Sequence, residues 1–188
     1  MLTQQEQDLV ASTLKQSEVK TSAVIKLIIL PASQAYHSYV VMYALILGSM
    51  VAMSLWTLDI LEAFPWLLAI QLGVVALIDL THSLNGFFIR FIPKTIRVKA
   101  GERAALHHYH SLHAHIPKGT GYVLLFVSLA ERYVHVVTSP TVHHKIPGDW
   151  HQVTDSFTQK MRSHGLASAC VATITQITDI VAPLFPAT

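Results

Sequence analysis

Residues Tyr39 to Leu58, YVVMYALILGSMVAMSLWTL, form an uncharged apolar run that decides the predicted fold. A second apolar run, Trp66 to Ile89, reads WLLAIQLGVVALIDLTHSLNGFFI and carries one acid. About 20 apolar residues span the hydrocarbon core of a bilayer as a helix, and both runs reach that length. The sequence therefore predicts a transmembrane helical hairpin. The alternative is a pair of buried helices in a soluble all-α protein, but such helices normally carry a polar stripe, and the first run has none.

The charges around the hairpin predict its orientation. All 13 Lys and Arg lie outside the two apolar runs and their turn, which carries only Asp59 and Glu62. Basic residues favour the cytoplasmic side, so we expect a two-pass protein of the bacterial inner membrane with both termini in the cytoplasm. The run RFIPKTIRVKAGER after the hairpin would also attract anionic headgroups, which makes membrane lipids expected partners.

Bulk composition agrees with this class of protein. Hydrophobic residues make up 52% of the chain and charged residues 13%. A net charge of +2 is too small to indicate a nucleic-acid partner. A single cysteine, Cys170, excludes an intrachain disulfide and is typical of a reducing compartment. The polar first 20 residues do not resemble a secretory signal.

The segments on either side of the hairpin predict helices and strands. Thr3 and Glu6 have the spacing of a capping box, which begins a helix that ends near Glu18. Apolar runs rich in β-branched residues predict strands at Ala23–Leu30, Val123–Leu129 and Tyr133–Val137, the last two as an antiparallel hairpin. Helical periodicity predicts a helix from about Lys99 to His115, and two more after residue 148, separated at Gly165.

These elements predict one small α/β (α+β) domain interrupted by a two-helix transmembrane hairpin. Residues 1–35 would form its first part, residues 36–92 the hairpin, and residues 93–188 its second part. Both parts emerge on the same side of the hairpin. We therefore expect strand Ala23–Leu30 to join strand Val123–Leu129 in a common sheet.

Two stretches carry a resemblance to a known family: LTQQEQDLV…TSAVIKLII near the start, and TGYVLLFVSLAERYVHVV, followed by Trp150. They resemble the TPM domain, named for its occurrence in a thylakoid lumen acid phosphatase, and a membrane-inserted bacterial branch is similar across nearly the whole chain. The resemblance implies the fold and, by analogy, weak acid phosphatase activity. Relatives usually have Ala-Asp and a Gly where this chain reads Thr138-Ser139-Pro140, and tend to have Glu where it has His135. An acidic site of the family's type is therefore not expected.

Histidines are the most unusual feature of the composition, with 12 in the chain. His107, His110 and His113 have i,i+3 spacing on one helix, and His135 lies on a strand. Neutral imidazole suits Zn or Cu, so these four residues are the candidate metal ligands. A closed site needs three or four converging ligands, and the alternative is that these histidines are structural or exposed.

Ionisable residues inside a predicted membrane span suggest a functional role, here in proton transfer or cofactor binding. Asp79 and His82 are three residues apart there, and the alternative is that they hydrogen-bond each other or Arg90. His37 and His82 would be the axial ligands of a haem, if one were bound.

The remaining reactive residues have plainer interpretations. Glu131-Arg132 could contact a ligand but is more typical of a solvated turn. Ser128 lacks the Gly-x-Ser-x-Gly setting of a nucleophile. Cys170, on the apolar face of a predicted helix, is expected to be an inert core thiol.

Taken together, these observations predict a membrane-anchored, non-catalytic accessory or assembly subunit of a larger inner-membrane complex, respiratory or photosynthetic. Its partners would be other integral membrane subunits. Small residues suited to close helix packing support this prediction; they are Gly48, Ser49, Ala52, Gly73 and Ala76. The alternatives are an acid phosphatase-like hydrolase and a His-rich metal-binding protein.

Overall fold

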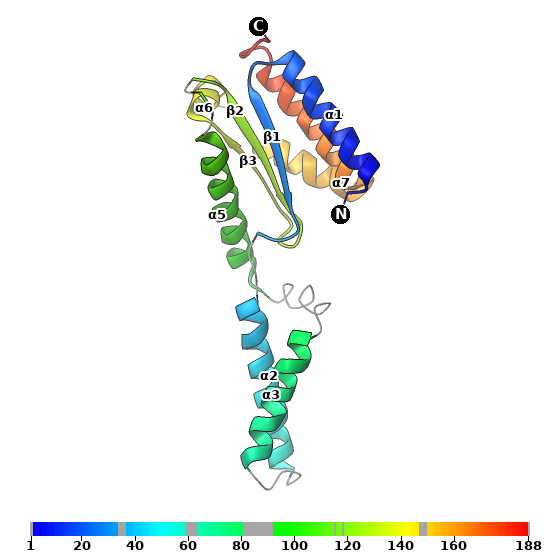
Figure 1. Ribbon diagram of the computed structural model, residues 1–188, viewed down its shortest axis with the longest axis vertical. Helices are drawn as coiled ribbons and strands as arrows, with labels where there is room; N and C mark the ends of the chain where they lie inside the picture. Colours follow the sequence, from blue (N-terminus) through cyan, green and yellow to red (C-terminus); the bar gives the residue numbers. More distant parts are fainter. Residues whose placement is uncertain are drawn as a thin grey trace. The chain divides into compact units, whose positions relative to one another are not determined.

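The computed structural model describes residues 2–33, 37–58, 64–80, 92–114, 116–117, 119–146 and 150–187. The chain divides into two compact units, the first made of residues 1–33 and 99–188, the second of residues 34–98. Among the described residues there are six helices and one sheet (Figure 1).

The first unit is built on a three-stranded sheet in the order β1-β2-β3. Strand β1 (Val24–Leu30) lies parallel to β2 (Tyr122–Ser128), and β2 is antiparallel to β3 (Tyr133–Thr138). In the β1–β2 register, Val24 pairs with Tyr122 and Leu30 with Ser128. This pairing confirms the common sheet predicted from sequence. The antiparallel β2–β3 pair confirms the predicted β-hairpin.

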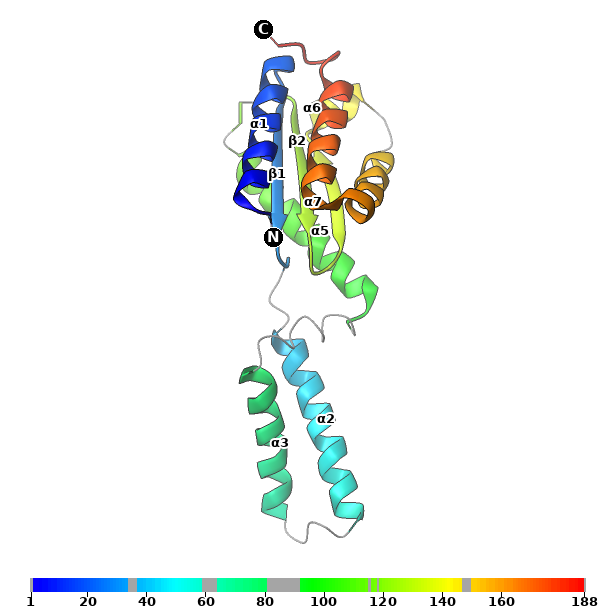
Figure 2. The same ribbon diagram turned by 90° about the vertical axis from the view of Figure 1, so that its right-hand side faces the viewer.

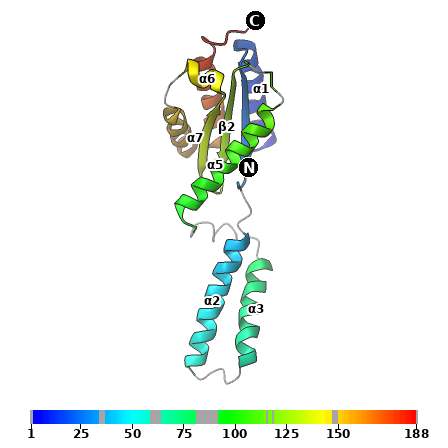
Figure 3. The ribbon, with the colours of Figure 1, turned by 90° about the vertical axis from the view of Figure 1, so that its left-hand side faces the viewer.

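Helices cover both faces of this sheet. Figure 2 shows α1 (Gln4–Lys20) and α7 (His151–Val181) in front of the strands. Figure 3 shows α5 (Lys94–His113) crossing the opposite face. The short α6 (Pro140–Lys145) follows β3. The first unit is therefore a three-layer arrangement with the sheet in the middle.

Strand β2 is the centre of the core because both of its faces are covered. All seven of its residues are buried. Val123, Leu125 and Val127 belong to the main core with α1 and α7, whereas Tyr122 and Leu124 pack with Tyr109 of α5. Successive side chains of a strand point to opposite faces, so a strand covered twice must be apolar throughout. Its continuous apolar run predicted this position correctly.

The ends of the helices mostly follow the sequence signals. The capping box is confirmed: the Thr3 N–H donates to Glu6 Oε2 at 2.7 Å, and the Glu6 N–H donates to Thr3 Oγ1 at 3.4 Å. Gly165 has φ 85° and ψ 175°, so it separates two helical segments of α7 as predicted. Helix α5 begins earlier than predicted, at Lys94, because the chain turns into a helix directly after Pro93, whose carbonyl accepts from the Ile96 N–H at 3.0 Å.

The second unit is a pair of packed helices, α2 (His37–Thr57) and α3 (Phe64–Leu80). Ala44 and Ala52 are buried on the side of α2 that meets α3. Between them, a Cβ at Gly48 would lie 3.4 Å from the Cα of Gln71, so glycine permits a close approach of the two backbones. The Gln71 side-chain amide also donates to Ser49 Oγ at 2.5 Å. A helical hairpin is therefore present, as predicted.

The predicted membrane crossing is wrong. Within the described ranges, no helix has both the length and the apolar character that crossing a membrane requires. The transmembrane hairpin of residues 36–92 and the two-pass inner-membrane location with both termini cytoplasmic are therefore not supported.

Candidate functional site

The outer surface of the helical hairpin is apolar and exposed. Many of its large side chains are at least two-fifths exposed, and Leu72 reaches 68% and Met50 63%. We call the following residues the hairpin surface: Met42, Leu45, Ile46, Leu47, Met50, Val51, Met53 and Trp56 on α2, and Trp66, Leu68 and Leu72 on α3. Large apolar surfaces of this kind mark interaction sites.

On α2 the hairpin surface extends around most of the helix. Helix α3 covers the side of Ala44, Gly48 and Ala52, which follow one another at intervals of four residues. With 3.6 residues per turn, the exposed apolar positions occupy about two thirds of the circumference of α2. Residues 37–58 contain no Asp, Glu, Lys or Arg. A partner would therefore recognise this surface by its shape and apolar area and not by ion pairs.

The small residues of the hairpin divide into two groups. Gly48 lies inside the α2–α3 contact, as the predicted close packing requires. Gly73 and Ala76 on α3 are exposed instead, and a Cβ at Gly73 would meet no atom within 4 Å. Both positions therefore present small residues on an exposed side of α3.

The three predicted metal ligands on α5 lie in different environments. His107 and His110 are exposed. His113 is half-buried, stacked on the Tyr109 ring with 5.1 Å between ring centroids and 5.8 Å from the Tyr122 ring. Its imidazole therefore packs in an aromatic cluster between α5 and β2.

The fourth predicted ligand, His135, lies on β3 opposite Phe126 and stacks on Tyr133 with 5.9 Å between centroids. Burial lowers the pKa of His135 below its usual value; Glu102 opposes that shift and His151 adds to it. Across the described part of the chain, no three His, Cys, Asp or Glu side chains are placed to hold a metal ion together. The structure does not bring the four histidines into one site.

Glu131 has a role that sequence reasoning missed. The Glu131-Arg132 pair was interpreted as a solvated turn, but Glu131 is only 5% exposed. Its carboxylate accepts the Ser33 N–H at 2.9 Å and the Ser128 hydroxyl. These bonds tie the segment after β1 to the β2–β3 turn. The neighbouring Arg132 is exposed, as predicted, and has φ 52°.

Ser139 and Cys170 also have structural roles. Ser139 stands where the TPM resemblance places an acid, and its buried Oγ accepts the Tyr122 N–H at 3.1 Å and the Val142 N–H at 3.4 Å, which caps α6. Burial raises the pKa of Cys170 to about 12, so the thiol stays protonated and unreactive. The hypotheses on Asp79, His82 and His37 concern side chains outside the described set.

Comparisons with known proteins bear on the fold alone. No family model matches the chain, and no curated protein matches it. Among solved structures, the NMR structure of the BA42 protein from the psychrophilic bacterium Bizionia argentinensis superposes with a TM-score of 0.57. It is 12% identical, and the match covers 100% of this chain and 86% of that chain. The TPM resemblance stays a prediction.

Proposed function

We propose that the protein is a non-catalytic accessory subunit that joins a larger protein assembly through its helical hairpin. The observation that carries this proposal is the hairpin surface, with side chains such as Met50 and Leu72 more than 60% exposed. Removing apolar area from water is worth about 25 cal/mol per Å². Burying this surface against a partner would therefore stabilise the assembly strongly.

The partner we propose is a set of apolar helices that pack on more than one side of the hairpin. A single flat surface cannot cover two thirds of the circumference of α2. The exposed small residues Gly73 and Ala76 support close approach of another helix to α3, since small residues let helix backbones approach each other. The TPM resemblance adds respiratory or photosynthetic complexes as a class of partner, by analogy only.

The polar residues of the first unit support a role without catalysis. Glu131 and Ser128 tie two turns together, and Ser139 caps a helix. His113 and His135 are packed against tyrosine rings. Each of these groups has a structural task that accounts for its position.

Native mass spectrometry after gentle extraction from the source cells tests this proposal. The chain should appear in a complex larger than itself that contains at least one other protein. Met50→Glu on α2 and Leu72→Glu on α3 should each release it, because either places a charge on the hairpin surface. Leu106→Glu is the matched control, since Leu106 is 41% exposed on α5 of the other unit.

Two results would overturn the proposal. One is a chain that migrates alone before any substitution. The other is binding of the wild-type chain to protein-free phospholipid vesicles as strongly as to the complex in the cell extract. That result would make lipid the partner instead of protein.

A further inference from the structure

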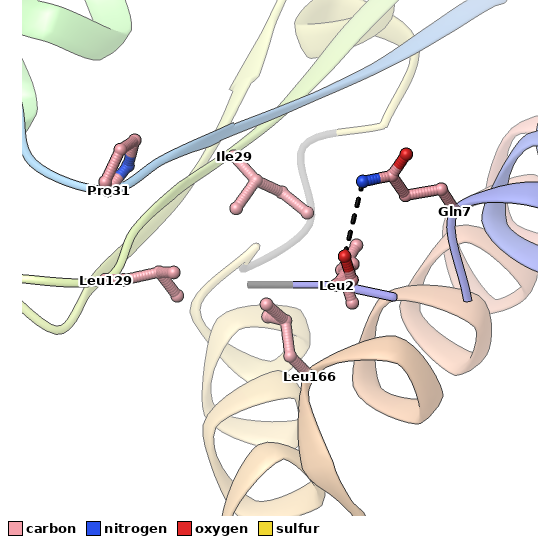
Figure 4. A pocket seen from close by; sticks show the side chains of 6 residues that line it. All are labelled: Leu2, Gln7, Ile29, Pro31, Leu129 and Leu166. Carbon is pink, nitrogen blue, oxygen red and sulfur yellow. Dashed lines mark hydrogen bonds between the residues drawn. The ribbon is translucent and has the colours of Figure 1, made fainter. Parts of the chain in front are cut away.

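A small pocket opens at the carboxyl ends of the two parallel strands of the first unit. Its volume is about 210 Å³. Figure 4 shows the side chains that line it: Leu2, Gln7, Ile29, Pro31, Leu129 and Leu166. In open α/β sheets, ligands commonly bind beyond the carboxyl ends of parallel strands.

Four separate parts of the fold build this pocket. Ile29 comes from β1 and Leu129 directly follows β2. Leu166 follows Gly165, whose φ of 85° interrupts α7. Leu2 and Gln7 come from the start of α1 and the residues before it. Ile29, Leu129 and Leu166 also pack on the main core, so the walls are held in place from behind.

The lining defines the chemistry of the occupant. Among the described residues that line it, five of six are apolar and none is charged. A charged group would lose its hydration there without a partner, so the occupant is uncharged. Pockets for whole small ligands usually measure about 300–1,000 Å³, whereas a cavity of about 150 Å³ accommodates benzene. The size therefore fits one large apolar side chain better than a complete metabolite or cofactor.

The rim of the pocket already binds a peptide group. The Gln7 side-chain amide donates to the backbone carbonyl of Leu2 at 3.3 Å, and the Leu2 side chain lines the pocket (Figure 4). One extended segment thus presents a carbonyl to Gln7 and a leucine to the apolar walls. The Gln7 amide has a second N–H, which a second segment could use while its side chain packs on the same apolar walls.

We propose that this pocket binds one leucine, isoleucine or phenylalanine side chain from an extended segment of a partner protein, with Gln7 hydrogen-bonding the backbone of that segment. Aromatic and aliphatic anchors seated in such pockets dominate many protein interfaces. This site lies in the first unit and is separate from the hairpin surface, so either proposal can fail without the other.

Methyl NMR titration of the full-length chain tests this inference with two probes, N-acetyl-phenylalaninamide and toluene. The capped amino acid should cause saturable shifts of the Ile29, Leu129 and Leu166 methyl signals. Toluene should bind the same place about two- to tenfold more weakly, because it lacks the peptide group that Gln7 bonds.

Three variants sharpen the test. Leu166→Trp should fill the pocket and abolish the shifts at Ile29 and Leu129, whereas Leu106→Trp on α5 should leave them unchanged. Gln7 is exposed, so Gln7→Ala should not disturb the core. It should weaken binding of the capped amino acid about two- to tenfold and leave binding of toluene unaffected. If Leu166→Trp does not fold, Leu129→Phe replaces it.

Either of two outcomes would overturn the proposal. Absence of saturable shifts with both probes would show that the pocket binds no apolar group. Equal affinity for toluene and the capped amino acid, with no effect of Gln7→Ala, would show a site for free apolar molecules instead of a peptide segment.

Discussion

Gly101 lets α5 approach β3, because a Cβ at this position would lie 2.7 Å from Cγ of Tyr133. Gly101→Ala should therefore push the helix away from the strand. We expect a net loss of about 1–2 kcal/mol in the free energy of unfolding, since overpacking outweighs the gain in helix propensity. For a chain of this size, that lowers the melting temperature by about 3–6 °C, which calorimetry would detect.

Gly73→Ala is the matched control for Gly101→Ala, because it lies within α3 and a Cβ there meets nothing within 4 Å. It should be neutral or raise stability by up to about 1 kcal/mol. Equal destabilisation by both substitutions would show that the Tyr133 contact is not the cause.

Glu131 connects two turns that are far apart in sequence. Glu131→Ala would leave the Ser33 N–H and the Ser128 hydroxyl without their carboxylate partner. Unfolding in urea should show a loss of about 1.5–3 kcal/mol, the range for hydrogen bonds to a charged group. Arg132→Gly next to it should be neutral or stabilising, because φ is 52° there. A loss below about 0.5 kcal/mol in the free energy of unfolding of Glu131→Ala would contradict this role.

At the scale of elements, β3 should make stability depend on pH through His135. Burial lowers the pKa of His135 in the folded chain below about 6.5, the unfolded value. The unfolded chain therefore binds more protons in this window, so stability is full above the unfolded pKa and falls as the pH drops below it. His135→Gln should flatten the decline between about pH 7.5 and pH 5, measured by urea unfolding. An unchanged slope in this variant would assign the decline to other groups.

Helix α7 consists of two segments because Gly165 adopts φ 85° and ψ 175°. This region of backbone space is essentially restricted to glycine, and other residues there cost about 1–3 kcal/mol. Gly165→Ala should lower stability by that amount even though a Cβ would meet no atom within 4 Å. Circular dichroism melting checks the change, and an unaltered melting temperature would mean that the two segments merge into one helix at no cost.

Elements whose patterns are local were predictable from sequence, and features that depend on distant partners were not. The apolar run Val123–Val127 of β2 indicated a doubly covered strand, and β2 is one. The histidine spacing did not bring the side chains together, because His107 and His113 are six residues apart and lie about 120° from each other around the helix axis. Glu131 was misread because its Ser33 partner is 98 residues away. The hairpin was predicted as a pair of helices, but its apolar composition was mistaken for evidence of membrane crossing.

At the scale of the whole molecule, each unit has an apolar core of its own. Among the described residues, the clusters around Phe157 and Tyr109 belong to the first unit, and Ala44 packs with Val74 and Val75 in the second. Gly48→Leu should force α2 and α3 apart, since even a Cβ there lies 3.4 Å from the backbone of Gln71. We expect a loss of about 1–3 kcal/mol in the hairpin.

Tryptophan indole NMR signals separate the two units in this experiment. The signals of Trp56 and Trp66 report on the hairpin, and that of Trp150 reports on the first unit. Gly48→Leu should shift the first two and leave the third in place. Movement of the Trp150 signal by a similar amount would show that the units fold as one.

The parallel pairing of β1 with β2 has a consequence during synthesis on the ribosome. Leu30 pairs with Ser128, so 98 further residues must be translated before the register is complete. At about 5–20 residues per second, the strand VIKLIIL waits roughly 5–20 s for its neighbour. Throughout that interval the nascent chain exposes an apolar segment that is prone to aggregation. Messages that stall within the hairpin should therefore yield aggregating fragments, and nascent-chain chaperones should crosslink to this strand first.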